Sequence, residues 1–514
     1  IRDETMAIGW QHVIGIALVL ILIAGVGLLS GRRVKNAADF TTGGGKAGAL
    51  MVCGTILGSL LSGQATVGTA QMAYTYGLSA WWFTLGAGLG CLVLAVGYAV
   101  PLRRGGQCTL LQVVSEKYGA RAGTLGSILC SLGIFISVVS QVLAACALLT
   151  TIFPMNTGEA VLLSLALMTV YVVFGGAWGA GMGGIVKMVL LYAAGMLGLI
   201  LVLSQGGVGA LLDHVKAVVL DAGVGAGSGI TNEGAFWHRF THLFARGVLQ
   251  DAGSGLSLLL GVLSTQTYAQ AIWSARSDNA ARKGALLSAF LMPVVGLACI
   301  GIGLFMRGHS ITEEEAAALI QAGQSVPEGL LVIGGSAQAF PAFIVHYMPG
   351  LVGGIALGAL LIAVVGGGAG LSLGVATILV NDIYTRISPR MREPRRNLIA
   401  SRATIVAVLA AAGGITAVIP GAIINDFGFL SMALRGAVVF VPLTFALFYP
   451  RQVDSRFVWG AIVMGPCAVL AGKLSGVLPF DPLFLGLAVA LFLMILGALA
   501  VNRRGTGNER NSSV

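Results

Sequence analysis

Residues 123–152 read GTLGSILCSLGIFISVVSQVLAACALLTTI, and this stretch decides the fold class. It is a continuous apolar run without a charged side chain. The hydrocarbon core of a bilayer is about 30 Å thick, so about 20 apolar residues in a helix cross it. A spanning segment must satisfy its own backbone hydrogen bonds, and a barrel strand would alternate in polarity. The run therefore predicts a transmembrane helix.

The same composition extends over the whole chain. Of its 514 residues, 56% are hydrophobic and only 10% are charged, and the mean hydropathy is +0.91. Soluble globular proteins have about 25% charged residues, so the composition excludes a soluble enzyme, a disordered scaffold and a nucleic-acid-binding protein. We predict an all-α polytopic membrane protein. No disulfides are expected, because the cysteines lie in apolar stretches or in one predicted cytoplasmic loop.

Polar and Gly/Pro-rich breaks divide the chain into about thirteen predicted transmembrane helices. They cover residues 8–29, 47–75, 79–101, 123–152, 158–175, 181–204, 248–273, 284–306, 348–381, 398–419, 425–448, 457–477 and 482–502. Lys and Arg gather after odd-numbered spans, so the positive-inside rule places the N terminus outside and the C terminus in the cytoplasm of a cell (plasma or inner) membrane. Topology then explains the net charge of +10 without a nucleic-acid partner. The acidic run Glu313–Glu315 falls in an outer loop as a predicted solvated face.

Spans 2–6 and 7–11 form two blocks of five, and an odd number of helices inverts the second copy relative to the first. The first span of each block is interrupted by small residues, which are Gly58, Ser59, Ser62 and Gly63 in span 2 and Gly253, Ser254 and Gly255 in span 7. Unwound backbone there would offer carbonyls to an ion or a solute, whereas close helix packing is the alternative. The predicted units are a peripheral first helix and cytoplasmic loop (1–45), the first repeat (46–205), an extracellular loop (206–247), the second repeat (248–450), and two peripheral C-terminal helices with a short tail (451–514).

Several short segments resemble, in order, the motifs of the sodium:solute symporter family. They are Ala38–Gly44 (ADFTTGG), Gly68–Leu78 (GTAQMAYTYGL), Thr109–Gln112 (TLLQ) with Lys117–Gly119, Tyr171 to Gly176, Gln266, Gln270, Ala281–Gly284 (ARKG), Asp382–Tyr384 (DIY), and Leu434–Ala437 (LRGA) with Pro442 and Leu443. The resemblance covers spans 1 to 11. It implies a leucine-transporter type of fold, alternating access, and uptake of a small polar solute coupled to a cation. No resident metal or cofactor is expected.

The chain departs from this family at the sodium site. A hydroxyl pair on span 9 ligates sodium in the family together with backbone carbonyls of the broken span 2, here near Gly58 and Leu61. Counting back from Asp382–Tyr384 places that pair on Gly366 and Gly367, which have no side-chain oxygen. Sodium would lose two of about five oxygen ligands, and an under-coordinated ion in an apolar site is not retained.

A second departure lies on span 6. The family's "T-D-x-x-Q" element places its acid on Gly184 and its glutamine on Lys187, so an anion is lost and a cation gained. We predict that the Lys187 ammonium replaces sodium, in room left by Gly366 and Gly367. A lysine desolvated in protein can load and release a proton near neutral pH, which would make the carrier proton-coupled or sodium-independent. The alternative is that Lys187 snorkels to the headgroups at the cytoplasmic end.

Polar side chains on the broken helices and on spans 3, 4 and 7 are the natural solute contacts in such a fold. The candidates are Ser62, Gln64, Gln71, Gln141, Ser254, Gln266 and Gln270. Amides both donate and accept hydrogen bonds, so they do not identify the solute, and bonding between helices is the alternative for each. The aromatic group Trp81–Phe83 is assigned to interface anchoring.

Two charged residues in the spans are assigned to gating or to structure. Asp251 lies near the outer end of span 7, and Arg435 lies within the apolar span 11. Arg435 could neutralise a carboxylate solute, and pairing with an acid or with backbone carbonyls is the alternative. Asp426 at the start of span 11 is a second candidate for an external gate, with capping as its alternative.

These observations predict a secondary active transporter for an organic acid, an amino acid or a sugar-like solute, coupled to H+ or Na+. An ordinary sodium-coupled symporter with other ligands is the first alternative. A transporter-like solute sensor is the alternative from another class. A channel would need polar rings along several helices, and an enzyme would need a titratable cluster at one depth, which the sequence does not contain.

Overall fold

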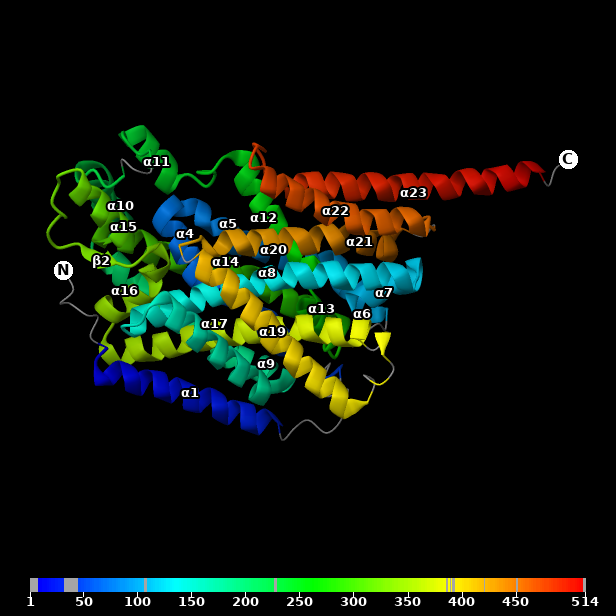
Figure 1. The fold of residues 1–514 in the computed structure, drawn as a ribbon, viewed down its shortest axis with the longest axis horizontal. Helices are drawn as coiled ribbons and strands as arrows, with labels where there is room; N and C mark the ends of the chain where they lie inside the picture. Colours follow the sequence, from blue (N-terminus) through cyan, green and yellow to red (C-terminus); the bar gives the residue numbers. More distant parts are fainter. Residues whose placement is uncertain are drawn as a thin grey trace.

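The computed structural model describes residues 8–31, 45–105, 109–225, 229–384, 387–388, 390, 393–419, 421–449 and 452–511. It is a bundle of helices aligned roughly along one axis (Figure 1). Nine helices of the described residues are long and apolar enough to cross a membrane, or ten if one bent pair counts as a single span. The predicted all-α polytopic class is confirmed, whereas the number of thirteen spans stays a prediction. The motif Ala38–Gly44 and Cys108 lie outside the described residues.

The bundle begins with α1 (Trp10–Gly31) and continues through the first predicted repeat. Its elements are α3 (Ala49–Leu60), η2 (Gln64–Gly68), α4 (Thr69–Tyr76), η3 (Gly77–Ala80), α5 (Trp81–Val93), η4 (Leu94–Tyr98), α6 (Ala99–Arg104), α7 (Leu110–Tyr118), α8 (Ala120–Ile152) and α9 (Thr157–Ser204). An outer segment follows, with α10 (Gly207–Lys216), η5 (Ala217–Asp221) and α11 (Glu233–Thr241).

The second predicted repeat also contains an outer segment, in which two short strands pair in parallel. Its elements are α12 (Val248–Leu263), α13 (Gln266–Trp273), α14 (Asp278–His309), β1 (Ser310–Thr312), α15 (Glu313–Gln321), β2 (Leu331–Ile333), η7 (Ser336–Gln338), α16 (Ala339–Tyr347), α17 (Gly350–Ile378), η8 (Leu379–Tyr384), α19 (Pro394–Val418), α20 (Ile424–Arg435), η10 (Gly436–Phe440) and α21 (Val441–Phe448). The chain ends with α22 (Ser455–Ser475) and α23 (Leu483–Asn511).

The first helix of each predicted block is interrupted, as expected, but the second interruption lies elsewhere. In the first block α3 ends at Leu60, and the π-helix η2 begins at Gln64. In the second block α12 and α13 meet at an angle of 46° around residues 264–265. Gly253 and Gly255 lie inside the continuous α12, so the prediction that they break it is wrong. A Cβ on Gly255 would lie 2.3 Å from the Trp82 ring, so this glycine serves close packing.

The helix α9 is continuous where the sequence predicts two spans, 158–175 and 181–204. Its 48 residues are longer than the roughly 20 that a bilayer core requires. The intervening residues contain glycines but no proline, and glycine alone does not remove a helical hydrogen bond. The prediction of a break between residues 175 and 181 is therefore wrong for the helix backbone.

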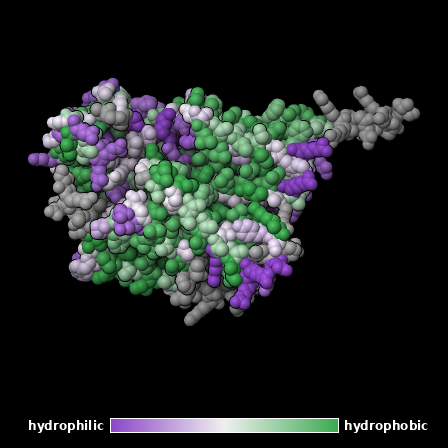
Figure 2. Space-filling model, viewed as in Figure 1, coloured by the Kyte–Doolittle hydropathy of each residue, from purple (hydrophilic) through white to green (hydrophobic). Residues whose placement is uncertain are grey.

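The surface separates into an apolar belt and two polar ends. Figure 2 shows hydrophobic side chains over the middle of the bundle and hydrophilic ones towards its ends. The helices α10, α11, α15 and α16 gather at the end where α1 begins, and α6 and α7 lie towards the opposite end (Figure 1). This arrangement agrees with the prediction that both long loops share the side of the N terminus. The orientation in the membrane stays a prediction.

Acidic residues of the outer loop differ from one another in their surroundings. Glu313 and Glu314 are exposed, as predicted for a solvated face. Glu315 instead forms a capping box with Thr312, and its carboxylate lies 2.7 Å from the guanidinium of Arg307, whose side chain is 5% exposed. The prediction is therefore wrong for Glu315, which compensates a buried charge.

Candidate functional site

A central cavity lies where the first broken helix faces α5, α8, α13, α17 and α20. Its empty volume is about 350 Å3. Five of the predicted site residues line it, which are Ser62, Gln64, Gln141, Gly367 and Arg435. The other lining residues are Ser59, Leu60, Phe83, Ser137, Tyr268, Leu371 and Met432. A buried pocket with apolar walls and a few convergent polar groups is typical of small-molecule sites.

Gln141 holds the first break open from α8. Its Oε1 accepts a hydrogen bond from the Gly63 backbone N–H at 3.1 Å, so this donor does not close a helical turn with Ser59. Gln64 follows the break, and its Nε2 donates to Ser140 at 2.8 Å and to Ser137 at 3.4 Å. Both amides thus join the broken helix to α8 and also line the cavity. Solute contact and helix-to-helix bonding, which the sequence treats as alternatives, are compatible for these two residues.

Arg435 is the charged residue of the cavity, and only 1% of it is exposed. Its Nε donates to the Ser431 carbonyl at 3.2 Å, and its Nη1 donates to Thr265 Oγ1 at 2.9 Å. Its Nη2 donates to Ser137 Oγ at 3.1 Å and to Ser431 Oγ at 2.8 Å. These acceptors are all neutral. Within the described part of the chain, Arg435 forms no ion pair with a carboxylate.

The two glycines at the positions assigned to the sodium site lie close to neighbouring side chains. A Cβ on Gly366 would lie 3.3 Å from Tyr171, and a Cβ on Gly367 would lie 3.1 Å from Gln141 Oε1 and 3.2 Å from Ser62 Cβ. The glycines therefore face these side chains, and the room that they are expected to leave for Lys187 stays a prediction. Leu61 is fully buried at the break itself.

Lys187 lies beside a glycine contact between α3 and α9. A Cβ on Gly58 would lie 2.6 Å from Gly184 Cα, and a Cβ on Gly184 would lie 2.8 Å from the Gly54 carbonyl oxygen. An acid at Gly184 would collide with the α3 backbone, which explains its absence here. Lys187 follows one helical turn later and is 7% exposed. Its ammonium forms no ion pair with a described carboxylate.

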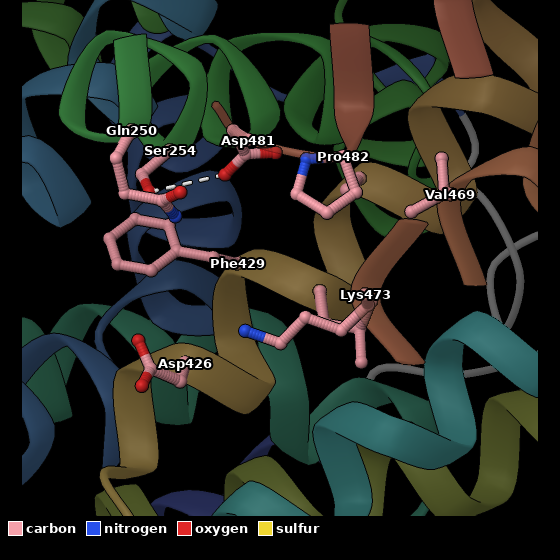
Figure 3. Close-up of a pocket in the computed structure, with 10 residues that line it drawn as sticks. Gln250, Ser254, Asp426, Phe429, Val469, Lys473, Asp481 and Pro482 are labelled. Carbon is pink, nitrogen blue, oxygen red and sulfur yellow. Dashed lines mark hydrogen bonds between the residues drawn. The ribbon is translucent and has the colours of Figure 1, made fainter. Parts of the chain in front are cut away.

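A second cavity lies at the outer end, between α12, α20, α22 and the loop before α23 (Figure 3). Its empty volume is about 330 Å3, and Ser254 and Asp481 line one side, with Asp481 accepting a hydrogen bond from Ser254 at 3.3 Å. Lys473 points into it towards the side of Asp426. Ser254 therefore lines this outer cavity and not the central one, and its role as a solute contact stays a prediction.

Arg246 connects the charges beside this outer cavity. Its Nε lies 2.6 Å from Asp251, which is fully buried, and its Nη1 lies 3.3 Å from Asp426 on α20. Its Nη2 donates to Ser254 at 3.2 Å, and its guanidinium lies 5.3 Å from the centre of the Phe429 ring. We name Arg246, Asp251, Asp426, Ser254 and Asp481 the outer cluster. The sequence predicts Asp251 and Asp426 as charged gate candidates but misses Arg246, because it lies in a loop.

Three amide candidates lie away from the central cavity. Gln71 accepts from the Ile424 backbone N–H at 2.9 Å and donates to the Ala422 carbonyl at 3.2 Å, so it caps α20. Gln266 accepts from the Leu110 backbone N–H at 3.0 Å at the start of α7. Gln270 shares the helical face of Gln266, whereas the cavity is lined by Tyr268 between them. These three amides are not among the residues that line the central cavity, and their role as solute contacts stays a prediction.

Sequence reasoning also misses apolar walls of the cavity. Phe83 is 1% exposed and packs edge-on against Phe429, with ring centres 5.5 Å apart, so its assignment to the membrane interface is wrong. Its neighbours Trp81 and Trp82 donate their indole N–H groups to the carbonyls of Pro293 and Leu243. Tyr268 and Met432 complete the apolar lining. Helical periodicity does not distinguish a cavity wall from ordinary core packing.

Comparison with known proteins yields one family and a shared fold. The family model described as the sodium:solute symporter family matches residues 40–464. A solved structure of a Na+-coupled sialic acid symporter in a substrate-bound outward-open state is 17% identical, with a TM-score of 0.69 over 96% of this chain and 97% of that chain. A nucleobase-cation-symport-1 family transporter in a closed conformation is 14% identical, with a TM-score of 0.51 over 91% of this chain and 96% of that chain. At these identities the two structures establish a common fold.

Proposed function

Because the chain belongs to the sodium:solute symporter family, we propose that it carries a small polar organic solute through its central cavity by alternating access. Family membership makes it a membrane transporter and not an enzyme, as the sequence predicts. Two interrupted helices, α3/η2/α4 and α12/α13, begin the two predicted five-helix blocks. Rocking of two inverted repeats around a fixed midplane site is the general mechanism for such folds. The central cavity adjoins the first break, which supports its assignment as that site.

Coupling in this carrier is proposed to be independent of sodium, and to use protons if it is coupled at all. The observation that carries this proposal is the absence of side-chain oxygen at Gly366 and Gly367, where the family places two ligands. A sodium ion held by the remaining backbone carbonyls near Gly58 and Leu61 would be under-coordinated. We assign Lys187 as the resident positive charge in its place.

The burial of Lys187 supports this assignment over snorkelling. A snorkelling lysine extends its ammonium to the headgroups, so its side chain is expected to be accessible at the bundle surface. Lys187 is only 7% exposed. A lysine inside a membrane bundle carries a large desolvation cost, so a lysine retained there marks a functional position. Because the glycine tract faces other side chains, the proposed role is a replacement of charge beside the α3–α9 contact, and not occupation of the sodium position itself.

Uptake into proteoliposomes, with sodium and proton gradients imposed separately, tests the coupling. The probes are labelled small carboxylates, amino acids and sugars. We expect accumulation that does not respond to a sodium gradient and that falls at least about tenfold in Lys187→Met. Lys283→Met removes an exposed lysine at the start of α14 and serves as the matched control.

Three outcomes would contradict this proposal in different ways. Accumulation driven by sodium alone, without a response to pH, would favour the ordinary sodium-coupled symporter with other ligands. Binding of a probe without any uptake, in vesicles whose protein is folded, would favour a solute sensor. Unchanged transport in Lys187→Met would remove the lysine from the coupling mechanism.

A further inference from the structure

The central cavity contains a permanent positive charge that forms no ion pair with any carboxylate among the described residues. Arg435 is held between α8, α13 and α20 by the neutral acceptors Ser137, Thr265 and Ser431. The titratable groups that interact with it electrostatically are Tyr268 and Cys130, and both are uncharged in their ordinary protonated forms. A buried guanidinium without an anion is costly, so it is retained where its charge is used.

The hydrogen bonds hold the Arg435 guanidinium in place but do not use all of its N–H donors. A guanidinium has five N–H donors in a planar fork. The hydrogen bonds of Arg435 engage Nε, one donor of Nη1 and both donors of Nη2. One N–H of Nη1 therefore has no acceptor among the described residues. Because the side chain lines the cavity, its charge lies beside any molecule bound there.

The remaining walls limit what that molecule can be. Phe83, Tyr268 and Met432 supply apolar surface, and each is less than 5% exposed. Gln64, Gln141 and Ser62 supply neutral hydrogen-bonding groups at the broken helix. The cavity has no carboxylate in its lining, so a cationic amine would meet a like charge without compensation.

We propose that the solute is a small organic monocarboxylate with an apolar body, whose carboxylate binds Arg435 in the central cavity. This inference rests on the proposed transport function and narrows its solute class. One negative charge balances one guanidinium, whereas a dianion would leave a net charge in an apolar site. Charge-assisted hydrogen bonds to a carboxylate are about twice as strong as neutral ones, so the anion is preferred to its uncharged analogue.

Binding to the purified full-length protein in detergent tests the proposal without requiring transport. The probes are matched pairs that differ only at the acid group, such as benzoate with benzamide and lactate with lactamide, with chloride as the inorganic arm. Affinity is measured by ligand-induced thermal stabilisation and by calorimetry. We expect at least one carboxylate to bind about tenfold or more tightly than its amide.

Variants at the guanidinium make the result specific. Arg435→Met is expected to abolish the preference for the carboxylate, and Arg435→Lys is expected to retain part of it, because lysine keeps the charge but not the planar fork. Arg456→Met removes an exposed arginine at the start of α22 and is the matched control, which keeps the preference.

Several outcomes would overturn the inference. These are equal binding of acid and amide, the same preference in Arg435→Met, stabilisation by chloride but by no carboxylate, and no binding of any carboxylate probe by folded protein. The proposed function fails separately. If a carboxylate binds through Arg435 but is not taken up by proteoliposomes, the site assignment stands and the transport proposal does not.

Discussion

The arginines at the outer end and the arginine of the central cavity have opposite electrostatic surroundings. At the outer end, Arg246 lies 2.6 Å from Asp251, and Arg307 lies 2.7 Å from Glu315. In the centre, Arg435 is 1% exposed and has only neutral acceptors. The outer arginines join segments of the protein to one another, so their charges are satisfied when no solute is bound. An uncompensated charge at the centre instead leaves its interaction energy for a ligand, which is why we place the function there.

The largest expected effect comes from breaking the compensated pair. In Asp251→Asn the Arg246 guanidinium keeps only the more distant Asp426, so a buried cation loses its main counter-charge. Breaking a buried ion pair costs about 3 to 5 kcal/mol, and we expect a loss of unfolding free energy of about 3 kcal/mol. Equilibrium unfolding in mixed micelles, monitored by tryptophan fluorescence, measures it.

The same measurement on Arg435→Met sharpens the contrast. Removing an uncompensated cation eliminates its desolvation cost, and the Ser137 and Ser431 hydroxyls still bond to each other at 2.7 Å. We expect a change within about 1 kcal/mol of wild type, together with loss of solute binding. If Asp251→Asn and Arg435→Met destabilise the protein equally, the distinction between the two regions is lost.

An effect smaller than that of Asp251→Asn is expected where α3 contacts α9 beside the proposed lysine. In Gly58→Ala the new Cβ would lie 2.6 Å from Gly184 Cα, and a backbone atom cannot rotate away. Such overpacking costs about 1 to 3 kcal/mol, and transport should fall because the two helices must separate slightly. Thermal unfolding and proteoliposome uptake report the two effects.

Gly48, which directly precedes α3, provides the control for that substitution. Gly48→Ala adds the same methyl group where no atom lies within 4 Å and the backbone is extended. Wild-type behaviour of both variants would show that the α3–α9 contact is looser than the structure indicates.

The sequence predicts the membrane class, because continuous apolar runs have one structural solution in a bilayer. It also singles out Ser62, Gln64 and Gln141 as candidate solute contacts, and all three line the central cavity, because a polar residue in an apolar helix near a break is uncommon enough to stand out. Arg435 lines the same cavity, although the sequence assigns it to gating or to structure. The sequence locates the region of the cavity more reliably than it identifies the individual polar residues that line it. Gln71 and Ser254 are equally polar, but they bond to the outer parts of the bundle.

Other parts of the site depend on contacts that no local pattern encodes. Phe83 and Tyr268 are indistinguishable in sequence from core aromatics, and only the position of α5 and α13 beside the cavity makes them cavity walls. The position of the second break was missed for a related reason. A glycine in an apolar helix indicates either close packing or an interruption of the helix. The ring of Trp82 lies against Gly255, so this glycine serves packing.

Asp481 offers the smallest and most specific test, because it is an acid of the outer cluster without an ion pair among the described residues. It is 5% exposed, and this burial raises the pKa of its carboxyl, opposed by hydrogen bonds from the Leu483 N–H and the Ser254 hydroxyl.

An acid whose folded pKa exceeds its unfolded value of about 3.9 binds protons more readily in the folded state, so its contribution to stability falls as pH rises between the two values. Relative to Asp481→Asn, wild type should therefore gain in melting temperature as the pH falls from the folded towards the unfolded pKa of this carboxyl. Asp213→Asn, which removes an exposed carboxylate of α10, corrects for the change in net charge. If wild type instead loses stability relative to Asp481→Asn on acidification, the carboxylate is stabilised as an anion, and the outer cluster compensates its negative charge as fully as its positive one.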